Sequence, residues 1–327
     1  METAMRLGMF ARLAPALLAL VLAAPMAHAQ AKKVRLDYAY YNPVSLVLKE
    51  KGWLEQELQS SGIAVEWVFS QGSNKSLEYL NGRSVDFGST AGAAALIARA
   101  NGIPIKGIYI YSKPEWTALV TKKDSAIRSV ADLKGKRIAV TRGTDPYIFL
   151  LRALDKNKLT DKDVKIVLLQ HPDGKTALER GDVDAWAGLD PFMAQTELES
   201  GSRLFFRDAD ANTYGFLNVR EDFLAENAEL AARVLAVYER GRKWALANPD
   251  ELKAILAKAA KLTDAVAAKQ LERTDLTNPR IGDVHREAVT AAGLVLQKGG
   301  VIPAEADVKA LAGVLVDTRF AAQVAGK

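Results

Sequence analysis

The sequence predicts an α/β protein with two doubly wound sheets and a helical C-terminal tail. Short apolar runs alternate with amphipathic stretches from Val34 to about Leu189, which is the spacing of strand–helix–strand units. The alternation breaks at Lys113–Glu115 and begins again, which indicates two lobes. From Ala228 onward the apolar residues recur almost entirely at helical spacing.

The first series begins with Val34–Tyr40, where apolar and polar residues alternate with period two as in a half-buried strand. Because each strand is followed by a helix, we expect a parallel sheet with crossover helices. Further strands are predicted at Ala64–Ser70, Val85–Gly88 and Ile105–Tyr111, and helices at Val44–Leu58, Leu77–Leu80 and Ala91–Ala100.

The second series repeats this pattern and then gives way to helices. Strands are predicted at Trp116–Thr121, Arg137–Thr141, Lys165–Leu169 and Asp184–Leu189, and helices at Val130–Lys136, Tyr147–Lys156, Lys175–Arg180 and from Pro191. One more strand, Tyr214–Arg220, precedes helices at Ala228–Ala247, Asp250–Lys261, Ala265–Asp275, Val284–Lys298 and Ala304–Leu315. We interpret Trp186, well inside its strand, as a core residue.

Residues 1–29 are predicted to be a secretory signal peptide. Arg6 and Arg12 precede the apolar run Leu13–Pro25, and Ala27-His28-Ala29 is a small-x-small cleavage site. We therefore expect a mature protein starting at Gln30 and located in the periplasm. The chain contains no cysteine, which excludes a lipid on an N-terminal cysteine, a disulfide, a thiolate nucleophile and a thiolate zinc site.

The charge pattern, the histidine content and the motifs give no sign of nucleic-acid binding, metal binding or hydrolase activity. The net charge is +5, and lysine and arginine are mixed with aspartate and glutamate, so no stripe for nucleic acid is predicted. Beyond the signal peptide only His171 and His285 remain, and neither has a companion at metal-ligand spacing. We therefore expect no metal and no cofactor. The sequence also lacks the Gly-x-Ser-x-Gly motif that is typical of serine hydrolases.

The turn after the strand Arg137–Thr141 is predicted to bind an anion. Gly143 makes the turn, Thr144 or Asp145 can cap the next helix, and Pro146 suits its first turn. A helix N-terminus presents free N–H groups and a partial positive charge. Ordinary capping is the alternative role for this turn.

A second unit of this kind follows the strand at Val85–Gly88. There Ser89, Thr90 and Ala91 stand at the start of a helix, and both hydroxyl groups can donate hydrogen bonds. Two helix ends at the carboxyl edges of two sheets would face one another across a cleft. Capping is again the alternative.

Six pieces of the chain between about Val34 and Val219 match a known family in order and spacing: Gly52–Glu55, Leu77–Gly82, Val85–Thr90, Val130–Val140, Leu151–Leu154 and Gly181–Phe192. On these pieces the chain resembles the extracytoplasmic solute-binding proteins of ABC importers, in the branch that binds aliphatic sulfonates and taurine. The resemblance implies a two-lobe periplasmic binding protein of type II, with the ligand in a cleft between the lobes. We expect lobe 1 at residues 30–111, lobe 2 at 112–213, and completion of lobe 1 with the C-terminal helices at 214–327.

The resemblance also implies a monomer that delivers a small organic anion, a sulfonate, to membrane permease subunits. Nitrate, an aromatic acid, an aryl sulfonate and a pyrimidine precursor remain open as ligands, as do an enzyme and a sensor on the same fold. The sequence has Ala91-Gly92 where sulfonate-binding members tend to have Gly-Asp. Asp145 would repel a sulfonate unless it turns away to cap its helix or pairs with Arg142.

Six further side chains are candidates for the cleft. Tyr41 and Asn42 follow the first strand and Gln71 follows the second, where each can equally belong to a solvated turn. Trp116 stands beside a crossing, where it either covers the ligand or packs at the hinge. Arg142 can pair with an anion or point to solvent. Asp190 can bind a ligand amine or cap the helix after Pro191.

Overall fold

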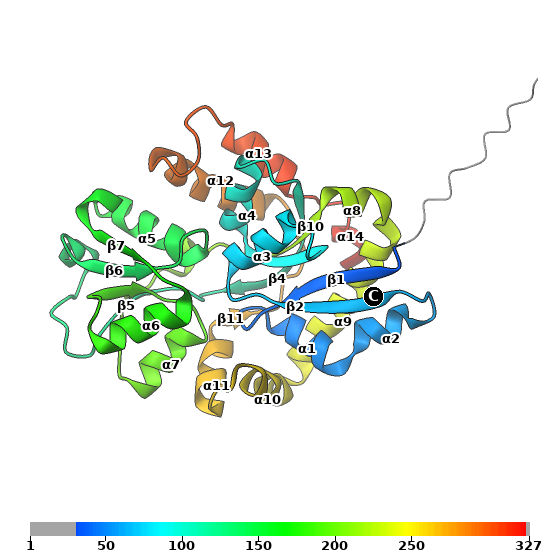
Figure 1. The fold of residues 1–327 in the computed structure, drawn as a ribbon, viewed down its shortest axis with the longest axis horizontal. Coiled ribbons are helices and arrows are strands. Elements are labelled where there is room, and N and C mark those ends of the chain that lie inside the picture. The colour runs from blue at the N-terminus through cyan, green and yellow to red at the C-terminus, as the bar shows by residue number, and fades with distance from the viewer. Residues whose placement is uncertain (1–30, 325–327) are drawn as a thin grey trace, which may run out of the picture.

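The computed structural model of the protein describes residues 31–324. The predicted signal peptide lies outside the described residues. Within the described part of the chain, no helix is both long enough and apolar enough to cross a membrane. The chain is organised around two sheets, which form two lobes beside one another in Figure 1.

The first sheet has six strands in the order β11-β4-β10-β3-β1-β2. At its parallel edge β1 pairs with both β2 and β3, and Lys33 lies opposite Ala64. The strands are β1 (Lys33–Tyr38), β2 (Ala64–Phe69), β3 (Phe87–Ala91), β4 (Ile105–Pro114), β10 (Gly215–Arg220) and β11 (Thr274–Asp275). We call the part of the chain around this sheet, residues 31–114 and 215–324, the first lobe.

The second sheet has five strands in the order β7-β6-β8-β5-β9. Its strands are β5 (Leu119–Thr121), β6 (Arg137–Val140), β7 (Lys165–Leu168), β8 (Ala185–Ala187) and β9 (Arg203–Phe206). We call residues 119–206 the second lobe. The chain crosses between the lobes in residues 115–118 and 207–214. The predicted domain boundaries at 111/112 and 213/214 stay a prediction.

The prediction of parallel sheets is right for most of the predicted strands and wrong for β5 and β10, while β11 lies where a helix was predicted to run on to Asp275. β10 runs antiparallel to both β3 and β4, β5 runs antiparallel to β8 and β9, and β11 runs antiparallel to β4. β5 and β10 are the first strands after a crossing. Because the chain leaves and enters each lobe at the edge that faces the other lobe, the strand after a crossing must run away from that edge.

The first lobe carries the helices of the N-terminal part and of the C-terminal region. They are α1 (Pro43–Lys51), α2 (Trp53–Gln59), α3 (Ser73–Asn81), α4 (Gly92–Ala100), α8 (Glu221–Glu226), α9 (Ala228–Ala247), α10 (Pro249–Ala260), α11 (Asp264–Glu272), α12 (Asp283–Lys298), α13 (Val308–Leu315) and α14 (Ala321–Val324). α1 packs on α9 and α10, and α4 packs on α12 and α13. The approach of α1 to α9 requires Gly241, because a Cβ there would lie 2.2 Å from Cδ1 of Leu48.

The second lobe contains three α-helices, and the C-terminal region contacts two of them. They are α5 (Asp145–Lys156), α6 (His171–Arg180) and α7 (Phe192–Glu199), with 3-10 helices η1 (Val130–Leu133) and η2 (Asp161–Asp163), while η3 (Ala209–Ala211) lies in the second crossing. α11 contacts α7, and α12 contacts α5. The helical tail therefore bridges both lobes, as the orange and brown helices in Figure 1 show.

Several elements differ from the sequence expectation. The strand predicted to begin at Trp116 begins at Leu119, because the N–H of Thr117 donates to Oδ1 of Asn212 in the other crossing and is unavailable to the sheet. β9 was not predicted, since its four half-buried residues are too few for a periodic signal. Trp186 is fully buried, which confirms its interpretation as a core residue.

Candidate functional site

Residues of both lobes enclose two adjoining spaces where the parallel strands of the two sheets end. A cavity of about 150 Å³ is lined by Tyr40, Tyr41, Phe69, Ser70, Gln71, Pro172, Leu189, Asp190, Pro191 and Phe192. A much narrower space is lined by Tyr41, Ser73, Trp116, Thr144, Asp145, Pro146 and Leu189. Tyr41 and Leu189 line both spaces, so the two are neighbours.

A roomier hollow of about 590 Å³ lies elsewhere on the second lobe, around Lys122, Asp124 and Lys136. These three side chains are exposed, and no residue of the first lobe contributes to the hollow. The hollow is an open, charged surface region. The two smaller spaces, by contrast, are lined by residues of both lobes, and six of the predicted site residues line them: Tyr41, Gln71, Trp116, Thr144, Asp145 and Asp190. We therefore take the gap between the lobes as the candidate site.

In the first lobe the predicted helix end at α4 is closed by oxygens of the protein itself. Its first three backbone N–H groups donate to nearby oxygens: Ala91 to Oγ of Ser73 at 2.9 Å, Gly92 to the carbonyl of Tyr214 at 2.9 Å, and Ala93 to Oγ1 of Thr213 at 3.2 Å. A ligand would have to displace these partners. The structure therefore does not offer α4 as an open anion site.

The hydroxyl groups predicted beside α4 also have partners within the first lobe. The N–H and the hydroxyl of Ser89 both donate to Oδ1 of Asp37, each at 2.8 Å. Burial raises the pKa of Asp37 to about 6. The amide of Asn42 donates to Oγ of Ser89 at 2.7 Å, and its Oδ1 accepts from the N–H of Ser45, which caps α1. Asn42 and Ser89 thus hold the lobe together.

Thr90 has the same internal role. Its hydroxyl donates to the carbonyl of Ala91 at 3.0 Å and accepts from the amide of Asn218 at 2.8 Å. Thr90 is fully buried between β3 and β10. The roles of Asn218 and Asp37 were not predicted from the sequence, because the residues to which they are hydrogen-bonded are distant along the chain.

The start of α3 is open toward the second lobe. The backbone N–H groups of Ser73 and Asn74 donate to no other group of the described chain, and Gly72 provides no side-chain cap. Oγ of Ser73 accepts from Ala91, so its own proton is free to donate. Oδ1 of Asn74 is buried and has no hydrogen-bond partner in the part of the chain that the structure describes. A Cβ built on Gly143 of the second lobe would lie 3.5 Å from Cβ of Asn74.

The start of α5 is the second open helix end, as the sequence predicts. Within residues 31–324 the backbone N–H groups of Gly143, Thr144 and Asp145 have no hydrogen-bond acceptor. Gly143 adopts φ +76°, which a glycine accommodates without strain. The hydroxyl of Thr144 donates to the carbonyl of Thr141 at 2.6 Å rather than capping the helix. The ends of α3 and α5 therefore meet across the gap.

Asp145 turns away from these amides and binds both crossing segments. Its Oδ2 accepts from Nε1 of Trp116 at 2.8 Å and from the N–H of Thr213 at 2.9 Å, and its Oδ1 accepts from the hydroxyl of Thr213 at 2.7 Å. Burial raises the pKa of Asp145. The expected alternatives, a cap or a pair with Arg142, are both wrong. Arg142 is exposed and lies 5.7 Å from the ring centre of Tyr147.

His171 is fully buried at the start of α6, at the boundary between the lobes. Nδ1 lies 3.2 Å from Oγ1 of Thr141, whose proton is donated to the carbonyl of Leu169. Nδ1 therefore carries a proton and donates it to Thr141. Nε2 has no hydrogen-bond partner among residues 31–324, and a Cβ on Gly72 of the first lobe would lie 2.9 Å from it. Burial lowers the pKa of His171 to about 3, so the ring is neutral at pH 7.

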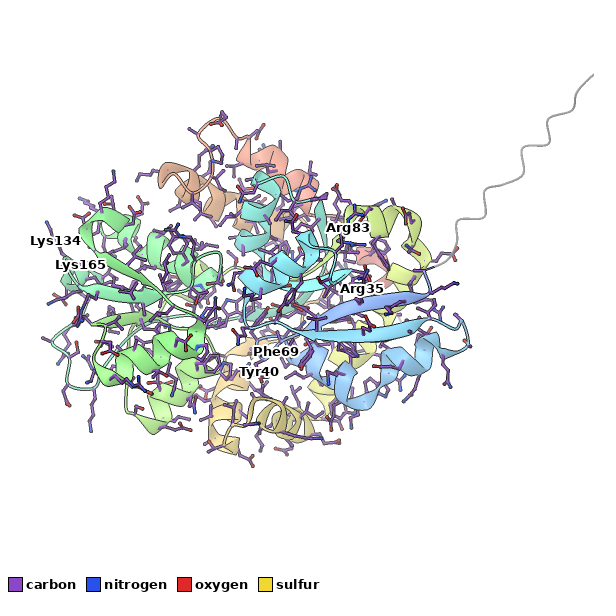
Figure 2. All side chains as sticks on the ribbon, in the orientation of Figure 1. Arg35, Tyr40, Phe69, Arg83, Lys134 and Lys165 are labelled. Atoms are coloured by element: carbon purple, nitrogen blue, oxygen red, sulfur yellow. The ribbon has the colours of Figure 1, made fainter. Side chains whose placement is uncertain are left out.

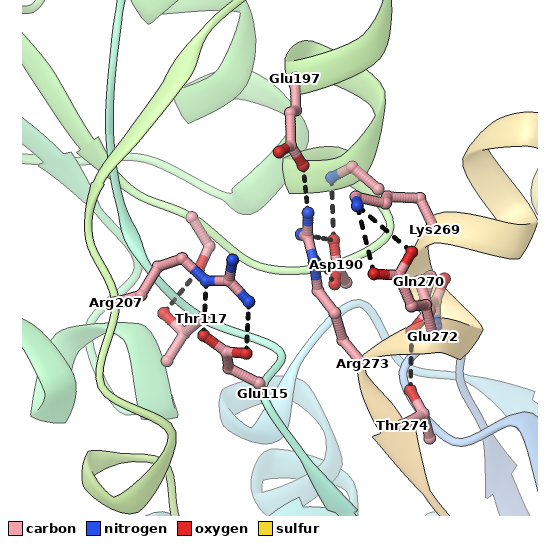
Figure 3. A network of polar contacts seen from close by, with 12 residues as sticks. Glu115, Thr117, Asp190, Glu197, Arg207, Lys269, Gln270, Glu272, Arg273 and Thr274 are labelled. Atoms are coloured by element: carbon pink, nitrogen blue, oxygen red, sulfur yellow. Dashed lines mark hydrogen bonds and ion pairs between the residues drawn. The ribbon is translucent and has the colours of Figure 1, made fainter.

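Asp190 forms an ion pair with a residue of the C-terminal region. Nη1 of Arg273 lies 3.4 Å from Oδ2, and the N–H of Ala194 donates to Oδ1 at 2.8 Å. Arg273 also binds Glu197, as Figure 3 shows. Burial raises the pKa of Asp190 to about 7, although Arg273 opposes this effect. Asp190 thus caps α7, as the sequence suggests, and also ties the second lobe to the first.

The aromatic candidates line the gap. The hydroxyl of Tyr41 donates to the carbonyl of Ser89, and its ring meets that of Trp116 edge-on at 6.0 Å. Tyr40 and Phe69 lie between the lobes in Figure 2, with ring centres 4.7 Å apart. Gln71 is exposed at the rim of the larger cavity.

Comparisons with known proteins agree with this architecture. A family model described as NMT1/THI5 like matches residues 44–252. A protein of Bacillus subtilis (strain 168) named putative aliphatic sulfonates-binding protein is 30% identical over 259 residues, which cover 78% of each chain. The structure of the alkanesulfonate-binding protein SsuA from Xanthomonas axonopodis pv. citri bound to MOPS is 24% identical, with a TM-score of 0.80, and the match covers 88% of this chain and 99% of that chain.

The fold is also found in an enzyme. The desulfurization enzyme DSZB is 14% identical with a TM-score of 0.65, and the match covers 89% of this chain and 98% of that chain. At this identity the likeness concerns the fold alone. The family model, by contrast, spans more than half of the chain, and the similarity to the Bacillus subtilis protein extends over most of both sequences. The chain therefore belongs to the NMT1/THI5-like family.

Proposed function

We propose that the chain is the periplasmic substrate-binding component of an ABC importer and that it binds a sulfonate in the gap between its lobes. The observation that carries the proposal is the meeting of two helix N-termini, α3 and α5, whose first N–H groups have no acceptor in the described chain. A sulfonate offers three oxygens and one negative charge, which suits converging N–H donors.

Each lobe supplies part of the proposed anion site. Ser73 and Asn74 of the first lobe and Gly143, Thr144 and Asp145 of the second lobe contribute backbone N–H groups, and Ser73 adds its hydroxyl. Because neither lobe can surround the anion alone, the bound state favours closure of the lobes. The carboxylate of Asp145 is held by Trp116 and Thr213, so it does not oppose the anion directly.

The wider role follows from the relatives. A curated relative is named an aliphatic sulfonates-binding protein, which supports a sulfonate as the ligand. We propose that the protein acts as a monomer, that the closed lobes dock on the permease subunits of the importer, and that its role is binding rather than catalysis. Nitrate and carboxylates are the competing ligands, since the same N–H groups can bind them.

Titration calorimetry of ligand-free protein tests this proposal. Ethanesulfonate, butanesulfonate, sulfate, nitrate and benzoate are each titrated at the same pH and ionic strength. We expect saturable binding of the sulfonates only. Binding of nitrate or benzoate with no binding of any sulfonate would reject the ligand while leaving the anion site standing.

A variant pair tests the position of the anion. Ser73→Ala removes the hydroxyl that is proposed to donate to the anion. The loss of one hydrogen bond to a charged ligand is worth about 1.5–3 kcal/mol, or roughly a tenfold to hundredfold weaker sulfonate affinity. Asn101→Ala at the far end of α4 is the control and should leave affinity unchanged. Equal affinities of the two variants would place the anion elsewhere.

A further inference from the structure

The larger cavity between the lobes has walls that are mainly aromatic and apolar. Tyr40 and Phe69 come from the first lobe, and Phe192 and Leu189 come from the second. The Tyr40 and Phe69 rings are tilted by 44° to each other at a centre distance of 4.7 Å. Tyr40, Phe69 and Phe192 are only partly buried, so each keeps ring surface available for a ligand.

The size of the cavity matches one ring. Its volume is about 150 Å³. An apolar cavity of roughly 150 Å³ in another protein stays dry and binds benzene. A six-membered ring therefore fills this space, whereas the two-carbon chain of taurine or ethanesulfonate leaves most of it empty.

The buried polar side chains of the cavity wall, Tyr41, Ser70 and Asp190, already have partners. Asp190 is paired with Arg273 and accepts from the N–H of Ala194. The hydroxyl of Ser70 donates to Asp37 at 2.7 Å. The wall therefore offers no unpaired carboxylate for the ammonium group of a ligand such as taurine. An uncharged group loses less hydration free energy than an ammonium group when it enters the cavity.

The cavity also adjoins the proposed anion site. Tyr41 and Leu189 line both the cavity and the narrow space beside Ser73 and Thr144. A ligand with its charged group at the starts of α3 and α5 would direct its organic part past Tyr41 into the cavity. We propose that this cavity receives an uncharged ring, so that the protein selects aryl sulfonates over taurine and short alkanesulfonates; this rests on the proposed sulfonate site.

Calorimetric titration of the full chain with benzenesulfonate, ethanesulfonate and taurine tests the selection. Four additional buried carbons at about 0.8 kcal/mol each correspond to roughly a hundredfold difference in affinity. Because the ring is only partly desolvated at the rim, the measured difference should be smaller than this. We expect benzenesulfonate to bind at least about tenfold more tightly than ethanesulfonate or taurine. Equal or tighter binding of ethanesulfonate or taurine would overturn the selection and leave the sulfonate site intact. Failure of all three to bind would reject the proposed function itself.

Variants locate the ring. Phe192→Ala should weaken benzenesulfonate about tenfold or more and change ethanesulfonate by less than about twofold, because only the ring reaches this wall. Phe205→Ala, a partly buried phenylalanine of β9 that does not line the cavity, is the control. If Phe192→Ala fails to fold, Phe192→Leu replaces it and should show a smaller loss in the same direction. If Phe192→Ala weakened both ligands equally, or neither of them, the ring would not lie in this cavity.

Discussion

The carboxylate of Asp145 in the second lobe accepts two hydrogen bonds from Thr213, one from its backbone N–H at 2.9 Å and one from its hydroxyl at 2.7 Å. The same carboxylate accepts from Trp116 in the other crossing segment. One side chain at the start of α5 therefore fixes both connections between the lobes. This position links the helix end proposed to bind the anion to both segments that connect the lobes.

Asp145→Asn should destabilise the protein. An amide has one acceptor oxygen and no charge, so the charge-assisted bonds are lost and the hydroxyl of Thr213, which now donates to Oδ1, would have to turn and accept from the new NH₂ group. We expect a loss of about 1–3 kcal/mol in the free energy of unfolding, measured by urea denaturation. Asp161→Asn, an exposed aspartate of η2, is the control and should change little. Equal unfolding midpoints for the two variants would show that Asp145 does not fix the crossings.

Arg273→Gln should destabilise the protein more at high pH than at low pH. The pKa of Asp190 is raised by burial to about 7. Below pH 7 its carboxyl group takes up a proton in the folded state, so loss of the guanidinium leaves a neutral group. Above pH 7 the parent protein keeps a carboxylate paired with Arg273. In the variant the pKa of Asp190 rises further, because Arg273 no longer lowers it, so the extra loss of stability grows by at most about 1.4 kcal/mol per pH unit. Urea denaturation at pH 5.5 and pH 8.5 measures the difference.

The matched control for the variant Arg273→Gln is Arg207→Gln. Arg207 makes a two-pronged ion pair with Glu115 beside the same crossing, with both distances at 2.7 Å (Figure 3), but its side chain is half exposed. An exposed pair contributes at most about 1 kcal/mol. Arg207→Gln should therefore have a small effect at both pH values. A pH-independent loss in Arg273→Gln would mean that Asp190 does not titrate in this range.

His171 should make the folded state sensitive to acid. Burial lowers its pKa from about 6.5 to about 3, so between these values the unfolded chain binds a proton that the folded chain does not. Its contribution to stability is complete above pH 6.5 and falls, by at most about 1.4 kcal/mol per pH unit, as the pH drops toward 3. Asp37 and Asp190, with raised pKa values, act in the opposite direction over part of this range.

His171→Asn isolates this contribution, because its amide can replace the Nδ1–H bond to Thr141. We expect the difference in unfolding free energy between the parent protein and the variant to shrink as the pH falls from 7 to 4. Urea denaturation at three pH values in this range provides the measurement. A constant difference would show that His171 is not held neutral by burial.

Gly174→Ala should disturb the core of the second lobe. A Cβ at Gly174 would lie 2.6 Å from Nε1 of Trp186, which is fully buried. Overpacking of this kind costs about 1–3 kcal/mol, so the thermal midpoint should fall by several degrees. Gly135→Ala is unsuitable as a control because of its positive φ, but Gly313→Ala in α13 has open space around it and should be neutral or slightly stabilising. Equal midpoints would mean that Trp186 can move aside.

The sequence allowed most of the secondary structure to be predicted, because periodicity is a local property. Helix α9 has the predicted bounds Ala228–Ala247, and the turn at Gly143 precedes a helix with an open N-terminus as expected. The helix of the first lobe that faces the start of α5 could not be predicted from periodicity. Both Gly72 and Ala91 precede helices, and only the fold shows that the α4 amides are already bonded to Ser73, Thr213 and Tyr214.

By itself the sequence determined the two α/β series, the helical tail, the helix end at Gly143–Asp145 and the burial of Trp186. The tertiary structure alone decided the reversed strands β5 and β10, which amides are bonded at the start of α4, the contact of Asp145 with Thr213, and the pairing of Asp190 with Arg273. The reason is physical. Periodicity and turn chemistry act over a few residues, whereas a buried carboxylate or amide is satisfied by whichever donor or acceptor the fold brings near it, and those partners lie tens of residues away along the chain.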